Sequence, residues 1–252
     1  SVGCVIVKND EIISIGQTGY NGRPHAEFNA IKNSTEILEG STMYVTLEPC
    51  NHYGKTPPCT KEIIKKRISK VIYSVEDIDK KVKGKSFKIL LSKNVIVKKG
   101  LLNKEINNFY KPYFFNRKNK IPYVTGKIAI SKNNLIFSKG TKRITNIHSD
   151  KFTHFLRYKN DSLMITYKTL NEDNPKLSCR LKGLSKFSPK RIILDSDLKM
   201  SINSYIFKTV NKINTIVFYN KANKTKISTF KKKGVKLIQS NLLKNGNFNI
   251  KL

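Results

Sequence analysis

The sequence predicts an α/β protein with two consecutive domains, covering residues 1–116 and 117–252. The length suits two small domains of roughly 100 to 150 residues each. A content of 38% hydrophobic residues indicates a folded chain. Strand-like apolar runs alternate with helix-like segments in both halves, which is typical of βαβ units. A basic, Asn-containing connector near residue 116 interrupts this alternation and marks the expected boundary.

The first half begins with a predicted β-hairpin, in which apolar runs over 2–7 and 11–16 flank the turn residues Asn9 and Asp10. A helix is then expected to start near His25, directly after a proline. Alternating elements follow, and they are expected over 42–48 (strand), 60–68 (helix), 70–76 (strand), 87–93 (helix), 95–100 (strand) and 102–120 (helix). This order predicts a largely parallel sheet that is covered on both faces.

The second half restarts the strand pattern with the segment IPYVTGKIAIS, residues 121–131. The later elements again alternate, and they are expected over 150–159 (helix), 162–167 (strand), 190–195 (strand), 214–219 (strand), 224–233 (helix) and 235–239 (strand). We therefore predict a second α/β domain, with no detectable repeat of the first.

The chain is strongly basic, since 49 Lys and Arg against 17 Asp and Glu give a formal net charge of +32. The excess is mainly Lys and is spread along the whole chain, which favours compositional drift over a nucleic-acid partner. A positive field still suits a phosphorylated substrate. A basic zinc domain that holds RNA, with a catalytically silent second half, is the alternative from another class. Binding whose affinity falls steeply with salt would favour that alternative.

The first residues, SVGCVIV, lack the features of a signal peptide, and no apolar run approaches about 18 residues. We therefore expect a cytoplasmic protein that does not enter a membrane. Its abrupt start within a strand pattern leads us to expect that further residues precede it. Four cysteines are too few for a disulfide scaffold and leave thiols for metal binding. The sequence leaves open whether the chain forms homo-oligomers.

The most informative pattern combines His25, Cys50 and Cys59 with Glu27. One imidazole and two thiolates suit a tetrahedral zinc ion whose fourth position is free for water. Glu27, two residues after a ligand, is expected to take the proton of that water and return it to a departing amine. His25 and Cys50 are both expected where helices begin, so that positive helix ends favour the thiolate. H-x-E followed by P-C and a later Cys is a zinc-deaminase signature.

A closed structural zinc site is the competing interpretation of these residues. It needs a fourth ligand, for which His52 is the nearby candidate. A tRNA or nucleotide deaminase is a further alternative. However, eight residues separate the two cysteines, where nucleic-acid and cytidine deaminases usually have two. We therefore expect a catalytic zinc site of another kind of deaminase.

The first half resembles the deaminase domain of the bifunctional riboflavin-biosynthesis deaminase/reductases in four segments, VGCVIVKNDEI, PHAEFNAI, MYVTLEPCNHYGKTPPCT and VIYSVED. The resemblance covers nearly the whole chain and is weaker after residue 115. It implies a cytidine-deaminase-like three-layer domain followed by a dihydrofolate-reductase-like α/β domain. It also implies zinc-dependent hydrolysis of the 2-amino group of 2,5-diamino-6-(5-phosphoribosylamino)pyrimidin-4(3H)-one. NADPH-dependent reduction of the ribosyl side chain to ribityl would follow.

Two positions of the first half bear on substrate binding. The resemblance makes Lys55, in the loop between the cysteines, a candidate for contact with the substrate's phosphate or pyrimidine edge. The alternative for Lys55 is a solvated lysine. The family usually has His seven residues before the ligand His, where this chain has Thr18. This difference concerns the affinity for substrate and leaves the predicted zinc ligands unchanged.

The second half resembles the family's reductase domain in VTGKIAIS, LRYKND, LMITYKTLNEDNPKLSCR and RIILDS. The resemblance places on the cofactor side Ala129, Arg143, Thr169, Asp173 and Ser196. It places on the substrate side Thr141, Arg157, Leu177 and Arg180. Arginines suit the clamping of a phosphate. The alternatives are a turn role for Asp173 and a solvated helix face for Arg157.

Several reductase features of the family are altered or absent. The usual S-x-D-G turn appears as SKNN at 131–134, and Arg143 and Lys168 stand where a Trp and a small residue are customary. A later E-x-G-P phosphate loop does not occur before Leu252, so either the chain is truncated or its reductase has decayed. We expect the chain to deaminate but to bind NADPH weakly. Without the loop, the cofactor's phosphate loses charge-assisted hydrogen bonds that are worth roughly 1.5 to 3 kcal/mol each.

Overall fold

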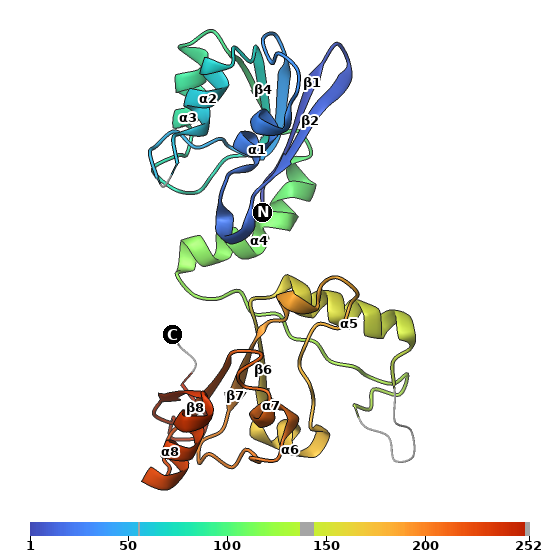
Figure 1. The fold of residues 1–252 in the computed structure, drawn as a ribbon, viewed down its shortest axis with the longest axis vertical. Helices are drawn as coiled ribbons and strands as arrows, with labels where there is room; N and C mark the ends of the chain where they lie inside the picture. Colours follow the sequence, from blue (N-terminus) through green and yellow to red (C-terminus); the bar gives the residue numbers. More distant parts are fainter. Residues whose placement is uncertain (55, 137–143, 250–252) are drawn as a thin grey trace. The chain divides into compact units, whose positions relative to one another are not determined.

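The structure is a computed structural model that describes residues 1–54, 56–136 and 144–249. The chain divides into two compact units, Ser1–Thr125 and Gly126–Leu252 (Figure 1). Each unit has its own sheet and its own hydrophobic core. No helix within the described ranges is long and apolar enough to cross a membrane.

The first unit contains a five-stranded sheet of order β2-β1-β3-β4-β5. Its strands are β1 Gly3–Lys8, β2 Glu11–Gln17, β3 Thr42–Leu47, β4 Lys70–Val75 and β5 Ile96–Lys99. β1 runs antiparallel to both β2 and β3, whereas β3, β4 and β5 are parallel. The predicted hairpin is confirmed, and Asn9 and Asp10 in its turn both have positive φ, a conformation that Asn and Asp tolerate well. The parallel arrangement holds for three of the five strands.

Helices cover this sheet on both faces. They are α1 Ala26–Asn33, α2 Cys59–Lys65, α3 Lys85–Leu91 and α4 Asn103–Asn119, and a short 3₁₀ turn, η1, spans Tyr20–Gly22. Alternate strand residues such as Ile6, Met43 and Val71 are fully buried in a core shared with α1, α2 and α3. The opposite face includes Tyr44 and Ile72, and the beginning of α4 lies on that side. The result is the predicted three-layer arrangement.

The second unit contains a fully parallel four-stranded sheet of order β6-β7-β8-β9. Its strands are β6 Ser162–Thr166, β7 Lys190–Leu194, β8 Thr215–Tyr219 and β9 Lys236–Gln239. Its helices are α5 Ile147–Lys159, α6 Tyr167–Asp173, α7 Tyr205–Lys208 and α8 Lys224–Lys233, with a 3₁₀ turn, η2, over Ser185–Phe187. Leu170, Ile193, Val217 and Phe230 lie at the centre of its core. An α/β fold for this half is therefore confirmed.

Local capping explains where the helices of the second unit begin and end. The side chains of Asn146, Thr166 and Asn223 accept hydrogen bonds from backbone N–H groups in the first turns of α5, α6 and α8. Gly234, with φ of 95°, ends α8 in the left-handed conformation that glycine adopts without strain. These caps account for the close agreement between predicted and observed bounds of α8.

One expectation for the second half is wrong, and one helix was not foreseen. Residues 121–131 are apolar in pattern but form no strand, because they pair with none of the strands in the parts of the chain that the structure describes. The helix α6 follows β6 without a connecting loop and was not expected from the sequence. It forms because Thr166, the last residue of β6, also caps the helix.

Candidate active site

The starts of two helices position the predicted metal ligands. His25 is the N-cap of α1, and Glu27 lies in the first turn of that helix. Cys59 is the first residue of α2 and follows Pro58, whose ring suits a helix start. Cys50 lies in the loop after β3 and does not begin a helix, which corrects the expectation for this residue. It still reaches the start of α2, because the backbone N–H of Cys59 donates to its Sγ at 3.3 Å.

The three predicted ligands converge on one point. His25 Nδ1 lies 3.3 Å from Cys59 Sγ and 3.4 Å from Cys50 Sγ, and the three ligand atoms all lie within 4.8 Å of one another. Tetrahedral zinc with Zn–N of about 2.0 Å and Zn–S of about 2.3 Å would separate its ligand atoms by about 3.5 to 3.8 Å. The donor atoms and their spacing therefore fit a zinc ion.

The cluster formed by the described residues contains these three side chains and no fourth His, Cys or carboxylate ligand. His52, the candidate for a closed site, is outside the cluster, and its buried Nδ1 has no hydrogen-bond partner. Three protein ligands leave one coordination position for water or substrate. The geometry therefore favours a catalytic site over a closed structural one.

The two cysteines differ in how readily they lose a proton. Hydrogen bonds from the Cys59 thiol and from His25 lower the pKa of Cys50 to about 4, despite its partial burial. The same Cys50 contact, together with burial, raises the pKa of Cys59. The hydrogen bond to Cys50 raises the pKa of His25. Cys50 is therefore a thiolate that is ready to bind a cation.

Glu27 lies beside the cluster without belonging to it. Its side chain is 3% exposed and accepts a hydrogen bond from the Cys59 thiol. Burial raises the pKa of Glu27, so that this carboxyl takes up a proton more readily than an exposed glutamate. A buried carboxyl next to an open metal position is the arrangement expected of a general acid/base.

Polar contacts tie down the loop between the two cysteines. Arg23 Nη1 donates to Thr56 Oγ1 at 2.6 Å, and Lys61 Nζ donates to Tyr53 OH at 2.9 Å. Lys55, the predicted substrate contact, lies outside the described residues. Thr18, at the position where the family has His, bonds instead to the backbone of Val2 at the N-terminal end of β1.

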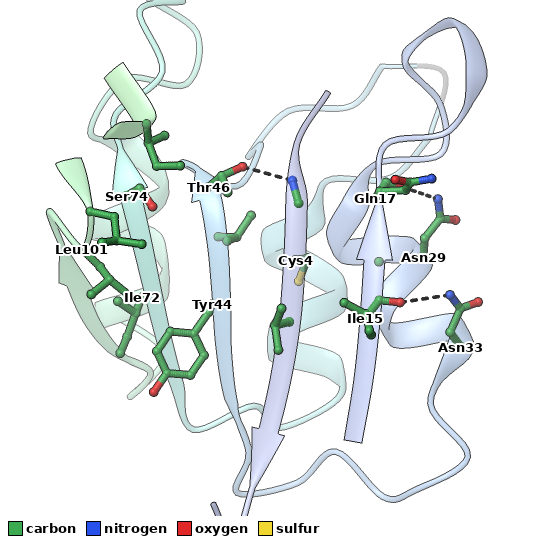
Figure 2. Close-up of a pocket in the computed structure, with 16 residues that line it drawn as sticks. Cys4, Ile15, Gln17, Asn29, Asn33, Tyr44, Thr46, Ile72, Ser74 and Leu101 are labelled. Carbon is green, nitrogen blue, oxygen red and sulfur yellow. Dashed lines mark hydrogen bonds between the residues drawn. The ribbon is translucent and has the colours of Figure 1, made fainter. Parts of the chain in front are cut away.

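A pocket of about 890 Å³ is lined by residues of the strands β1 to β4, by Asn29 and Asn33 of α1, and by the start of α4. Figure 2 shows Tyr44, Ile72 and Leu101 lining it. None of the four residues His25, Glu27, Cys50 and Cys59 lines this pocket. The candidate metal site of the first unit therefore lies outside this pocket.

In the second unit, the predicted substrate-side residues gather around one segment. Arg157 Nη1 donates to the carbonyl oxygen of Ser178 at 3.1 Å, and the backbone N–H of Arg180 donates to His154 Nδ1 at 3.2 Å. Burial and the nearby charge of Arg180 lower the pKa of Arg157. Leu177 is 5% exposed and packs in the core, so only its main chain could face a ligand.

Some predicted cofactor-side residues lie at the carboxyl ends of the parallel strands. Thr169 is in α6, just after β6, and Ser196 follows β7. Ligands of open α/β sheets bind at this edge. Asp173 is exposed at the end of α6, and Ala129 lies in the segment that forms no strand. Thr141 and Arg143 lie outside the described residues.

Two polar residues of these sites were missed by the sequence analysis. Glu48 is 3% exposed and lies two residues before Cys50. A glutamate at the end of a predicted strand and two residues from a metal ligand could have been recognised as a candidate site residue. His154 accepts a hydrogen bond from Arg180, and burial lowers its pKa. Nothing in the sequence pattern distinguished His154 from a solvated helix residue.

Comparison with known families assigns each half of the chain. Residues 1–75 match the family described as cytidine and deoxycytidylate deaminase zinc-binding region. Residues 122–250 match the family described as RibD C-terminal domain. The two matches correspond to the deaminase and reductase domains that the resemblance implied.

Curated relatives and solved structures agree with this assignment. The chain is 33% identical to the riboflavin biosynthesis protein RibD of Aquifex aeolicus over 240 residues, which cover 94% of this chain and 67% of the relative. For RibD of Actinobacillus pleuropneumoniae, the identity is 34% over 94% of this chain and 63% of the relative. The chain thus spans about two thirds of the length of these relatives.

Among solved structures, one of RibD from Acinetobacter baumannii superposes with a TM-score of 0.81 at 28% identity, over 97% of this chain and 68% of the other. The deaminase/reductase of Thermotoga maritima gives a TM-score of 0.80 at 29% identity, over 95% of this chain and 74% of the other. From its metal-ligand cluster, its two family matches and these relatives, the chain belongs to the RibD family of riboflavin biosynthesis proteins.

Proposed function

We propose that the first unit is a zinc-dependent hydrolytic deaminase that removes the 2-amino group of 2,5-diamino-6-(5-phosphoribosylamino)pyrimidin-4(3H)-one. The open cluster of His25, Cys50 and Cys59, with the buried Glu27 beside it, carries this proposal. The substrate is the one that membership of the RibD family implies. The net charge of +32 favours encounter with a phosphorylated pyrimidine.

His25 Nδ1 and the two cysteine sulfurs would hold the zinc. A zinc ion bound there supplies Lewis acidity that makes a water molecule a better nucleophile. Glu27 accepts a proton from the attacking water and donates it to the departing amine, which leaves as ammonia. Burial raises the pKa of Glu27, which stabilises the protonated form between these two transfers.

The direct test measures ammonia release from the diaminopyrimidinone phosphate by the zinc-loaded chain. We expect turnover that is lost when a chelator removes the metal and restored when zinc is added back. Stoichiometric zinc without any ammonia release would contradict the assignment of this substrate. Turnover that persists after complete removal of metal would contradict the zinc mechanism.

For the second unit, we propose NADPH-dependent reduction of the ribosyl side chain to ribityl. The match of residues 122–250 to the RibD C-terminal domain supports this reaction. Thr169 and Ser196, at the carboxyl ends of β6 and β7, are proposed contacts of the cofactor, as are Asp173, Ala129 and the undescribed Arg143. Hydride transfer needs little more from the protein than a positioned cofactor and substrate.

On the substrate side of the proposed reductase, Arg157 and Arg180 would bind the phosphate. Burial and, to a smaller extent, the charge of Arg180 lower the pKa of Arg157, so two positive charges lie close together here. Arg157 is oriented by its bond to Ser178, whereas the Arg180 side chain is exposed and free to reach a ligand. Leu177 and the undescribed Thr141 complete the proposed substrate contacts.

Arg180→Ala is expected to raise the KM for reduction by about 10- to 100-fold, because a charge-assisted hydrogen bond is worth roughly 1.5 to 3 kcal/mol. NADPH oxidation with the deaminated substrate measures this effect. Lys182→Ala, which removes an exposed cation two residues away, is the matched control and should leave KM unchanged. Equal KM values for both variants would remove Arg180 from the phosphate site.

A further inference from the structure

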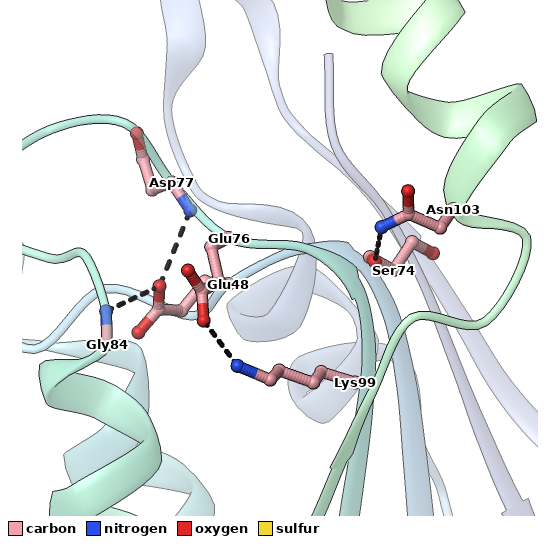
Figure 3. Close-up of polar contacts among 7 residues, drawn as sticks. All are labelled: Glu48, Ser74, Glu76, Asp77, Gly84, Lys99 and Asn103. Carbon is pink, nitrogen blue, oxygen red and sulfur yellow. Dashed lines mark hydrogen bonds and ion pairs between the residues drawn. The ribbon is translucent and has the colours of Figure 1, made fainter.

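Glu48 is a buried carboxylate whose side chain accepts hydrogen bonds from one neighbouring loop. It follows β3 directly, two residues before Cys50, and its side chain is 3% exposed. Its Oε2 accepts backbone hydrogen bonds from Gly84 N at 3.1 Å and from Asp77 N at 3.4 Å (Figure 3). Asp77 and Gly84 bracket the loop between β4 and α3, so a single carboxylate oxygen draws both ends of this loop together.

The start of α3, which follows this loop directly, holds the residue between Glu48 and Cys50. Ser86, fully buried in the first turn of α3, donates from its Oγ to the carbonyl oxygen of Pro49 at 2.5 Å. Both residues that precede the metal ligand are therefore fastened to one segment, 77–86. Their positions set the path of the backbone into Cys50.

That segment is itself held by α4. Tyr113 of α4 donates to Asp77 Oδ1 at 3.3 Å. Just before the segment, Asn103 Nδ2 of α4 donates to the carbonyl oxygen of Ser74 at 3.2 Å (Figure 3). Glu48 therefore bonds to a support that is fixed from α4.

The energetics oppose a purely space-filling role for Glu48. Its second oxygen, Oε1, is buried without a hydrogen-bond partner among the described residues. A half-satisfied buried carboxylate costs stability that an apolar side chain of similar size would not cost. Residues that violate such rules are found at functional sites.

We propose that Glu48 is a positioning residue that fixes the Cys50 sulfur in its metal-binding place by anchoring the backbone before it to the loop 77–86. Glu48 is not a member of the ligand cluster, and it acts through Pro49 and Cys50. Outer-shell partners of this kind typically change metal affinity by about 10- to 100-fold when they are removed. The inference rests on the proposed zinc site, and it adds a residue to that site.

Glu48→Leu provides the test, because leucine is of similar bulk but has no oxygen to accept the loop N–H groups, whereas an amide oxygen could still accept both bonds. We expect the apparent Kd for zinc, measured by competition with a chromophoric chelator, to rise about 10- to 100-fold. With Co²⁺ as the probe, the absorption bands from the metal and its thiolates should shift or weaken. A purely structural role would lower the melting temperature without altering this spectrum.

Glu76→Leu is the matched control, since it makes the same change at a carboxylate of the neighbouring loop that forms only a partly exposed ion pair. It should keep wild-type zinc affinity and a wild-type Co²⁺ spectrum. A zinc affinity and a Co²⁺ spectrum of Glu48→Leu that equal those of the control would overturn the inference while leaving the zinc site intact. If the wild-type chain bound neither metal, the proposed function would fail instead.

Ser86→Ala gives a second test should Glu48→Leu fail to fold. It removes only the hydroxyl that holds Pro49, so the folded unit should persist. We expect a weaker change in the same direction, with zinc affinity reduced several-fold and the Co²⁺ bands altered. Unchanged affinity and spectrum in Ser86→Ala would count against the loop as the support of Cys50.

Discussion

Glu27→Gln is expected to keep its zinc and its fold but to lose deamination on the order of a thousandfold or more. An amide cannot accept the proton of the attacking water, nor can it return a proton to the leaving amine. The metal ligands are untouched, because Glu27 lies beside the cluster of His25, Cys50 and Cys59 and is not a member of it. A coupled assay of ammonia release, with metal analysis of the same sample, measures both quantities.

Glu36→Gln is a suitable control for this variant, since Glu36 is exposed just beyond the end of α1. It should deaminate at the wild-type rate. Activity of Glu27→Gln within about tenfold of the wild type would remove Glu27 from the proton transfer, because a general acid/base contributes at least about a hundredfold. Loss of zinc from this variant would instead indicate that Glu27 helps to build the metal site.

The second large effect is the loss of metal from the Cys50→Ala, Cys59→Ala double variant. One imidazole without thiolates cannot hold zinc tightly, because two of the three protein ligands are gone. Purified double variant should contain far less than one zinc per chain and should not deaminate. Cys179→Ala, which changes a buried cysteine of the second unit, is the control and should keep its zinc. Stoichiometric zinc in the double variant would show that the ligand assignment is wrong.

Much of the fold was predictable because local signals agreed with the tertiary structure. The turn at Asn9 and Asp10, the cap at Asn223 and the stop at Gly234 each place an element end where the structure has it, whereas α5 begins at Ile147, before the expected residue 150. The metal ligands were predictable because their residue types and spacing are chemically specific. These features depend on side chains close together in the sequence or on a distinctive donor set.

The rest depended on contacts between distant segments. Residues 121–131 carry a strand pattern, but a pattern cannot provide the neighbouring strand that pairing requires. Glu48 is recognisable as a positioning residue only when the loop 77–86 is brought beside it. The grouping of Arg157 with the segment around Ser178 likewise joins positions 21 residues apart. Sequence periodicity does not predict such contacts between distant residues.

Mass analysis of reaction products tests the central claim most directly. The zinc-loaded chain is incubated with 2,5-diamino-6-(5-phosphoribosylamino)pyrimidin-4(3H)-one, with and without NADPH. Without NADPH, we expect one product in which oxygen replaces the 2-amino group, and with NADPH the same product carrying two further hydrogens. The deaminated product alone in both samples would mark the second unit as a decayed reductase. Unchanged substrate in the presence of stoichiometric zinc would contradict the account of this chain as a deaminase.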